Sequence, residues 1–233
     1  MLYFLVYNDD THNYFLNNLV ESVKKYGKNF EIIIFDKNDM DKDFVLKNQN
    51  ILELKRGGGY WLWKPYIINE TLKKMNDGDM VFYLDSKYYF IEEFTNLYSE
   101  YMKNNDLLVW KNKPNTPGFD LKNWCKMDVI LKYNMFDKIF NENVEDCWGG
   151  ALIVKKTQNT VKYMQEWLDM CCNYDDITDS PSKAENSSSF IEHRHDQCLL
   201  SIILHKNNIE QQFLESRYLQ NVRTPFSDTK SSV

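Results

Sequence analysis

The feature that most constrains the fold is a series of short apolar runs separated by helical patterns. Residues 2–7 have the pattern of a buried strand, and the turn-forming residues 8–10 follow them. Apolar residues then recur at helical spacing up to Gly27, before a second strand pattern at 30–35 and a short third one at 51–54. A strand, a helix and a strand at this spacing predict parallel βαβ units.

The rest of the chain continues this α/β pattern. Residues 80–84 are apolar throughout, which is typical of a central strand buried on both faces. Further strands are expected at 107–110 and 149–154, and an apolar helix is expected to begin near residue 195. The polar stretch 175–189 contains three successive serines, so we expect a loop there, either a lid or a disordered segment.

Length and charge limit the classes of protein to consider. The chain has 233 residues, of which 43% are hydrophobic and 27% charged, and this favours one globular domain over residues 1–223 with a frayed tail at 224–233. The net charge of −6 argues against nucleic-acid binding. Aromatic residues make up 15% of the chain, which suits a site that stacks bases and sugars.

The cysteines and the N-terminus indicate the compartment. The five cysteines include no C-x-x-C pair, so a disulfide framework and a zinc ribbon are both disfavoured, and we expect a reducing, cytoplasmic setting. No stretch has the length and apolarity of a signal peptide or a membrane span.

Polar residues follow the ends of several expected strands. Ligands of open α/β sheets bind at the carboxyl ends of the strands, so these residues are the first candidates for a site. They are Tyr7 and Asn8, Arg56 with the glycines around Gly58, Asp85 with Ser86 and Lys87, and Gly149 with Gly150.

Asp85 ends the most apolar strand. Its carboxylate could hold a divalent cation that bridges a diphosphate, since Mg²⁺ and Mn²⁺ prefer oxygen ligands. It could equally accept a hydrogen bond from a ribose hydroxyl, or serve only as a turn residue.

The glycine-rich segment 56–59 permits close backbone approach to a ligand but matches neither a Walker loop nor a dinucleotide fingerprint. The residues after it, Tyr60, Trp61 and Lys64, strengthen its candidacy. We expect Lys64 in the first turn of the next helix, as a mobile point charge that reaches a diphosphate.

The densest polar cluster is residues 192–197, ahead of an apolar helix. Backbone N–H groups at a helix N-terminus attract anions, so Arg194 and its neighbours are candidates for a site, although Asp196 could be only a cap. His193 and His195 alternate, so only one of them can face a given crevice if this stretch is extended. No cysteine or further histidine has the spacing of a zinc site.

Four segments occur together in order: Gly-Tyr-Trp-Leu-Trp-Lys-Pro-Tyr at 59–66, Asp-Gly-Asp at 77–79, Tyr-Leu-Asp at 83–85, and Phe-Ile-Glu-His-Arg-His-Asp-Gln at 190–197. Over roughly residues 1–205 the chain resembles GT-A glycosyltransferases of bacterial surface-polysaccharide loci and large DNA viruses. The resemblance implies a mixed, mainly parallel sheet flanked by helices, and a nucleotide-diphosphate sugar as donor.

The resemblance also implies residue roles. Asp85 would begin an Asp-x-Asp metal motif, and Asp196 and Gln197 would lie at the reaction centre. Tyr7 and Asn8 would lie near the base, Lys64 near the ribose or phosphate, and Gly149 with Gly150 at the sugar pocket. Together with the other candidates named above, the predicted donor-binding residues are Tyr7, Asn8, Arg56, Gly58, Tyr60, Trp61, Lys64, Asp85, Ser86, Lys87, Gly149, Gly150 and Arg194.

One residue departs from the family pattern, because Lys87 occupies the third position of Asp-x-Asp. A protonated lysine cannot ligate a metal. In one alternative Asp85 binds Mn²⁺ or Mg²⁺ together with His195, and this is favoured because GT-A enzymes usually use a metal. In the other, Lys87 acts with Lys64 and Arg194 to neutralise the diphosphate without a metal.

The main functional hypothesis is transfer of a hexose from a UDP-sugar, or a GDP-sugar, to a saccharide or protein hydroxyl. Asp196 would be the base of an inverting reaction, while Gln197 or Asp196 would face the sugar in a retaining one. The alternative is a degenerate subunit that binds sugar nucleotides without catalysis. A Rossmann oxidoreductase is disfavoured, because 8–10 are not glycines.

Overall fold

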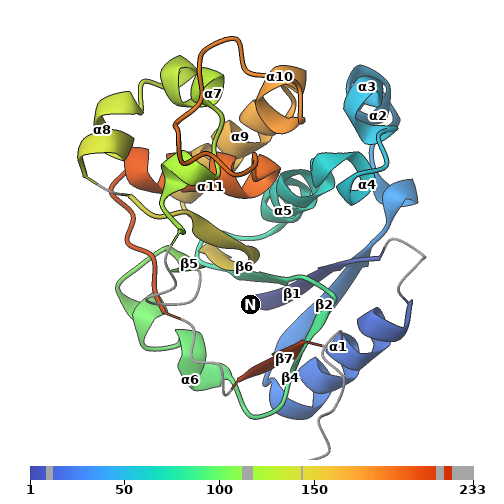
Figure 1. Ribbon diagram of the computed structural model, residues 1–233. Coiled ribbons are helices and arrows are strands. Elements are labelled where there is room, and N and C mark those ends of the chain that lie inside the picture. The colour runs from blue at the N-terminus through green and yellow to red at the C-terminus, as the bar shows by residue number, and fades with distance from the viewer. Residues whose placement is uncertain (9–12, 112–117, 143, 214–217, 222–233) are drawn as a thin grey trace, which may run out of the picture.

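The computed structural model describes residues 1–8, 13–111, 118–142, 144–213 and 218–221, so the expected tail at 224–233 lies outside the described residues. Its centre is a five-stranded sheet in the order β2-β1-β3-β6-β5 (Figure 1). The strands are β1 (Leu2–Tyr7), β2 (Phe30–Phe35), β3 (Met80–Leu84), β5 (Leu107–Lys111) and β6 (Cys147–Lys155).

The sheet is mixed but mainly parallel. Strand β1 pairs in parallel with both β2 and β3, whereas β6 pairs antiparallel with β3 on one side and β5 on the other. Four strands therefore run in one direction and β6 alone runs in the other. This arrangement confirms the expected fold class and the strands predicted at 2–7, 30–35, 80–84, 107–110 and 149–154.

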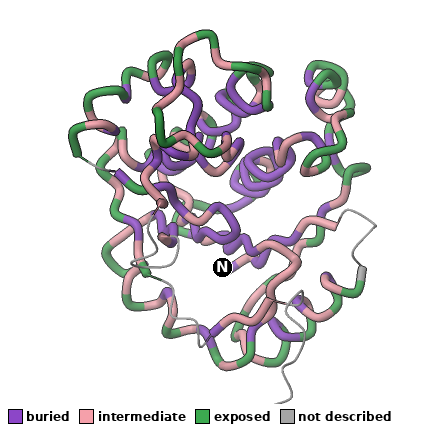
Figure 2. Tube along the Cα trace, viewed as in Figure 1, coloured by how far each residue is buried: buried purple, intermediate pink, exposed green. Residues whose placement is uncertain are grey.

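Helices cover both faces of the sheet (Figure 1). Helix α1 (Asn13–Tyr26) covers one face, and α5 (Trp63–Lys74), α9 (Gln158–Cys171) and α11 (His195–Lys206) cover the other. Side chains alternate along each strand, so Phe4 and Phe82 join the core under α1, while Leu5 and Tyr83 join the larger core under α5. The buried trace is concentrated in the sheet and in the helices packed on it (Figure 2).

The prediction of a third strand at 51–54 is wrong. Residues 49–52 form helix α3 (Gln49–Leu52), which follows α2 (Lys42–Lys47). The backbone N–H groups of Ile51 and Leu52 both donate to the carbonyl of Asn48, and Ile51 is buried. A short apolar run does not distinguish a buried strand from one turn of buried helix, and here the helix formed.

The loop at 175–189 is ordered, so the disordered alternative is wrong. After the short helix α10 (Tyr174–Ile177), the ammonium group of Lys126 donates to the carbonyls of Thr178 and Ser180. Farther along, the carboxylate of Asp128 accepts from the backbone N–H groups of Lys183 and Ala184. These bonds anchor the loop against the chain around residues 126–128.

Among the described residues no helix is both long and apolar enough to cross a membrane. The remaining elements are short. They are α4 (Gly57–Tyr60), α6 (Thr95–Tyr98), α7 (Met127–Lys132), α8 (Phe136–Asn141), the paired strands β4 (Tyr88–Phe90) and β7 (Leu219–Asn221), and single 3₁₀ turns at Lys37–Asp39, Tyr101–Lys103 and Leu121–Asn123.

Candidate functional site

A cavity of about 370 Å³ opens beside the carboxyl end of β3 and the start of β6. Segments far apart in the sequence meet there, as the resemblance implies. The predicted residues that line it are Arg56, Trp61, Lys64, Asp85, Lys87, Gly149, Gly150, Arg194, His195, Asp196 and Gln197. Tyr7, Asn8, Gly58, Tyr60 and Ser86 are absent from its lining. A larger cavity of about 710 Å³, lined by Lys111, Glu145 and His205 among others, contains none of the predicted residues.

Lys64 lies at the floor of the cavity, in the first turn of α5, and is 3% exposed. Its ammonium group donates to the carbonyl of Gly149 at 2.8 Å and lies 2.9 Å from a carboxylate oxygen of Asp196. Burial lowers the pKa of Lys64, but the charges of Asp196 and Asp85 outweigh burial and raise this pKa to about 12. Lys64 is therefore a fixed cation, and the expectation of a mobile point charge is wrong.

Asp85 lies beside cations on both of its oxygens. The hydroxyl of Tyr83 donates to Oδ1 at 2.7 Å, and the ammonium of Lys64 lies 3.7 Å from the same oxygen. The ammonium of Lys87 lies 3.5 Å from Oδ2. A divalent cation ligated by Asp85 would sit next to two ammonium groups, so the residues in this arrangement do not fit a metal site at Asp85.

Asp196 is buried at the start of α11, where burial raises its pKa and the charge of Lys64 opposes that shift. The next residue, Gln197, faces the cavity from the same turn. Its side-chain oxygen accepts from the backbone N–H of Gly149 at 3.0 Å, and its NH₂ group donates to the buried carboxylate of Asp146. The two residues expected at the reaction centre thus hold the Gly149 peptide, one directly and one through Lys64.

The glycine-rich segment brings aromatic rings to the cavity. Gly59 has a φ of +91°, and a Cβ there would lie 2.7 Å from the Cα of Leu52, so only glycine allows this approach. The turn lets the Trp63 indole donate to the carbonyl of Gly57 at 3.0 Å. The Trp63 ring stacks on Tyr7, with their centroids 3.9 Å apart, whereas the ring of this segment that lines the cavity is that of Trp61.

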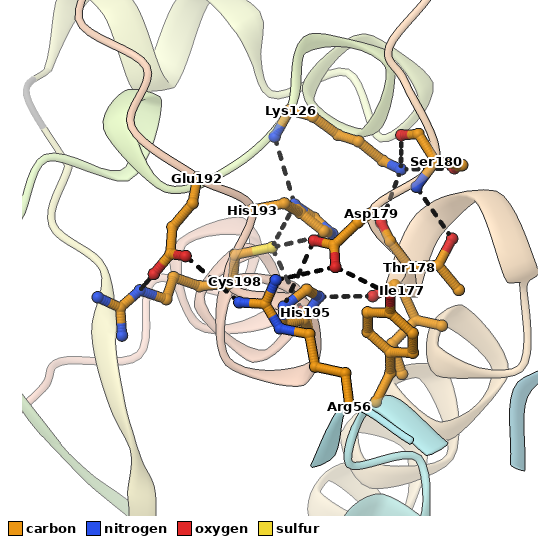
Figure 3. A network of polar contacts seen from close by, with 12 residues as sticks. Arg56, Lys126, Ile177, Thr178, Asp179, Ser180, Glu192, His193, His195 and Cys198 are labelled. Atoms are coloured by element: carbon orange, nitrogen blue, oxygen red, sulfur yellow. Dashed lines mark hydrogen bonds and ion pairs between the residues drawn. The ribbon is translucent and has the colours of Figure 1, made fainter. Parts of the chain in front are cut away.

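The rim of the cavity carries a second charged group (Figure 3). Arg56 pairs with Asp179 at 2.8 Å and with Glu192 at 3.3 Å, and the hydroxyl of Tyr60 also donates to Asp179. Arg194 pairs with the other oxygen of Glu192 at 3.1 Å. Glu192 therefore bridges the two arginines at the mouth of the cavity.

Only one histidine of the pair faces the cavity, as the alternation predicts. His195 lines it, with Nδ1 bonded to the carbonyl of Ile177 at 2.8 Å and Nε2 lying 3.8 Å from Asp179. Burial lowers its pKa to about 4, so the ring is neutral at pH 7. The ring stacks on Trp61, and its polar contacts are to the loop that carries Asp179.

His193 turns the other way and meets two cysteines that the sequence spacing did not connect. The ligand atoms of Cys125, His193 and Cys198 lie within 4.8 Å of one another, and all three residues are buried. The imidazole is already hydrogen-bonded at both nitrogens, to the Asp176 carbonyl at 2.7 Å and to the backbone N–H of Lys126 at 3.4 Å. These bonds account for the ring without a metal.

Sequence reasoning missed several residues of the site. Tyr88, Phe119 and Trp148 add aromatic surface to the cavity. Trp148 stands beside the predicted Gly149, and a Cβ at Gly150 would lie 2.6 Å from its indole nitrogen. The proximity of Trp148 to the glycines was the available signal, whereas nothing in the sequence connects Phe119 with them.

Comparison with solved structures identifies the fold. The bifunctional glycosyltransferase WbbM aligns over 91% of this chain with 12% identity and a TM-score of 0.54, and this chain covers 38% of WbbM. The galactosyltransferase LgtC, solved with donor and acceptor sugar analogues, aligns over 96% of this chain and 87% of its own, with 13% identity and a TM-score of 0.50. Mouse xyloside xylosyltransferase 1 aligns over 92% and 84%, with 8% identity and a TM-score of 0.50.

No family model matches the sequence, and no curated protein matches it significantly. The structural likeness shows that the chain has the GT-A glycosyltransferase fold. At these identities the likeness extends to the fold and not to a particular donor or acceptor.

Proposed function

We propose that the chain transfers a hexose from a nucleotide-diphosphate sugar, with UDP-sugars favoured over GDP-sugars, to a hydroxyl of a saccharide or protein acceptor. The observation that carries this proposal is the buried cation Lys64, held between Asp85, Asp196 and the Gly149 carbonyl at the floor of the cavity. A fixed positive charge at the carboxyl end of a central strand suits a reaction in which a diphosphate leaves with negative charge.

The lining supports a particular placement of the donor. The diphosphate lies toward Lys87 and Arg194, whose side chains are partly exposed and line the cavity. The nucleoside lies toward Trp61 and the glycine-rich turn, with Tyr7 and Trp63 stacked behind them. The sugar lies toward Gly149 and Gly150, which line the cavity beside Gln197 and Trp148.

In this proposal Lys87 takes the role that a metal would otherwise fill. Its ammonium lies 3.5 Å from Asp85 and is partly exposed, so it is free to turn from Asp85 to a bound phosphate. Lys64 and Arg194 add further positive charge. This combination stabilises the leaving diphosphate without proton transfer to it.

Asp196 and Gln197 receive different roles. Asp196 is buried and paired with Lys64, an arrangement that suits an electrostatic anchor better than a base that must reach an acceptor. Gln197 presents its amide to the cavity, so we assign it to contact the donor sugar. Asp196→Asn should therefore weaken donor binding and the stability of the fold together.

The first test is thermal stabilisation of the purified protein by UDP, GDP and their sugars, each with Mn²⁺ and with EDTA. A ligand that binds only the native state raises Tm according to its concentration relative to Kd. We expect one nucleotide series to raise Tm equally with Mn²⁺ and with EDTA. A shift that requires Mn²⁺ would reject the lysine assignment, and no shift with any donor would reject the function.

One observation favours the alternative of a degenerate sugar-nucleotide-binding subunit. Lys87 stands where the family that the chain resembles has the second acidic residue of its metal motif. Both carboxylate oxygens of Asp85 lie beside lysine ammonium groups. A degenerate subunit would show the same thermal shift but no release of nucleotide from the donor, with or without acceptors. Measuring nucleotide release for the stabilising donor separates the two functions.

A further inference from the structure

A buried carboxylate lies directly behind the proposed reaction centre. Asp146 precedes β6, is 1% exposed, and is absent from the lining of the cavity. The hydroxyl of Ser201 donates to its Oδ1 at 2.8 Å, and the amide of Gln197 donates to its Oδ2. Both partners belong to α11, so Asp146 connects the start of β6 with the first two turns of that helix.

The two neighbours of the Gln197 amide select one of its two orientations. An amide presents an acceptor on one side and donors on the other, and most environments accept either face. Here the backbone N–H of Gly149 requires the oxygen, and the Asp146 carboxylate, which is ionised above about pH 7, requires the NH₂ group. A flipped amide would set donor against donor and acceptor against acceptor, so Asp146 and Gly149 together fix which atoms of Gln197 face the cavity.

The Gly149 peptide transmits this arrangement to the floor of the cavity. Its N–H donates to Gln197, and its carbonyl accepts from Lys64 at 2.8 Å, so side chains from two helices hold the same residue. A Cβ at Gly149 would lie 3.0 Å from the Cβ of Gln197, which leaves little room for another position of that side chain.

Holding Asp146 in this place costs stability. Burial raises the pKa of Asp146 to about 7 although Ser201 and Gln197 both donate hydrogen bonds to it. A fold selected for stability alone would gain from a neutral side chain here. Buried charges that cost stability and support a cavity side chain are typical of functional sites.

We propose that Asp146 is a positioning residue, which fixes the orientation of the Gln197 amide and thereby the geometry in which the donor sugar is held. This role rests on the proposed function, since it gives Gln197 a donor to contact. Asp146 itself touches no substrate and acts only through Gln197 and the Gly149 peptide.

The test compares Asp146→Leu with Asp146→Asn, using the nucleotide sugar that raises Tm most and following release of its nucleotide. Leucine removes both acceptors, so we expect kcat to fall roughly 10–100-fold while KM changes less than about threefold. Asparagine can accept from Gln197 and donate to Ser201, whose hydroxyl then turns to the Gln197 carbonyl 3.0 Å away. It should lose less kcat than leucine, and its Tm at pH 8 should equal or exceed that of the wild type.

Asp176→Leu is the matched control, because Asp176 is also a buried aspartate but bonds to Lys132 and Tyr133 away from the cavity. It should lower Tm and leave kcat of the folded protein unchanged. Wild-type kcat in Asp146→Leu, or a loss that follows only the unfolded fraction, would overturn the proposal.

The side-chain NH₂ resonances of Gln197 in an ¹⁵N spectrum supply a readout that needs no donor. We expect two separate, slowly exchanging signals in the wild type and their loss in Asp146→Leu. If no donor turns over, the proposed function fails, while these signals still decide whether Asp146 holds the amide. Unchanged signals in the leucine variant would refute the positioning role.

Discussion

Two ion pairs at the cavity have nearly equal distances between their charged atoms, but one pair is buried and the other is exposed. Lys64 and Asp196 are 2.9 Å apart with side chains 4% and 5% exposed, whereas Arg56 and Asp179 are 2.8 Å apart with side chains 42% and 41% exposed. Charges interact several-fold more strongly in a protein interior than near water, and an unpaired charge there is costly. Burial, rather than contact distance, therefore decides which of the two ion pairs the stability of the fold depends on.

The largest effect should follow from Lys64→Met, which leaves Asp196 and Asp85 without their buried cation. We expect the free energy of unfolding at pH 7 to fall by about 3–5 kcal/mol, the usual cost of breaking a buried pair from one side. Urea denaturation measures it. Lys73→Met, at an exposed lysine that pairs with Glu70, should change stability by less than about 0.5 kcal/mol. If Lys64→Met were as stable as the wild type, the buried pair would contribute no more to stability than the exposed pair does.

The second effect concerns pH and the buried Asp146. Because its pKa is raised from 3.8 to about 7 by burial, the folded state holds a proton that the unfolded state releases. The stabilisation is present below pH 4 and is lost as pH rises through 7. Between pH 5 and pH 8 we expect the wild type to lose roughly 2–3 kcal/mol more than Asp146→Asn does. Denaturation curves of both proteins at the two pH values check this, and parallel losses would contradict the assignment.

The side chain of Lys87 is 35% exposed, between that of Lys64 and that of Arg56, and Lys87 should affect catalysis more than folding. If its ammonium neutralises the diphosphate, Lys87→Ala should lower kcat/KM for the donor roughly 10–100-fold, or about 1.4–2.7 kcal/mol, with Tm nearly unchanged. Steady-state kinetics with EDTA and with Mn²⁺ measure this loss. Lys103→Ala, at an exposed lysine paired with Glu100, is the control. Full rescue by Mn²⁺ would show that a metal can take the site and would weaken the metal-free proposal.

A small effect, on stability alone, should follow from Arg56→Ala at the rim. Its ion pairs with Asp179 and Glu192 are partly exposed, so we expect a loss below about 1 kcal/mol at low salt that nearly vanishes at about 1 M salt. Thermal unfolding across a salt series measures it. A loss above about 2 kcal/mol, independent of salt, would place the rim with the buried group after all.

The strands of the sheet and most residues that line the cavity could be predicted from the sequence. Continuous apolar runs such as 80–84 show where a strand ends, and the cavity lies at the carboxyl end of that strand. Prediction from the sequence failed at 51–54, where one buried turn of helix has the same apolar content as a short strand. It also failed to foresee that Lys64 is buried. The burial of a lysine depends on carboxylates that arrive from β3 and α11, which no local pattern reveals.

Asp146 shows the same limit. Gly149 and Gly150 indicated a site nearby, but no local pattern marks Asp146 itself, and its role arises because Ser201 and Gln197 project from α11 onto the start of β6. The cluster of His193 with Cys125 and Cys198 arose likewise from the folding of distant segments. Spacing rules detect ligands that lie close together along the chain, and they miss residues that tertiary packing brings together.

The reversed direction of β6 has a consequence for synthesis and folding. Because β6 alone runs against the other strands, its first residues, rather than its last, reach the edge of the sheet where Asp85 lies. The floor of the cavity therefore needs residues near 64, 85, 149 and 196 together, and the last of these leave the ribosome late. Contacts so distant in sequence close slowly, so a nascent chain should hold Lys64 without its closest carboxylate, Asp196, until α11 has been made. The reaction centre is consequently among the last parts of this molecule to assemble.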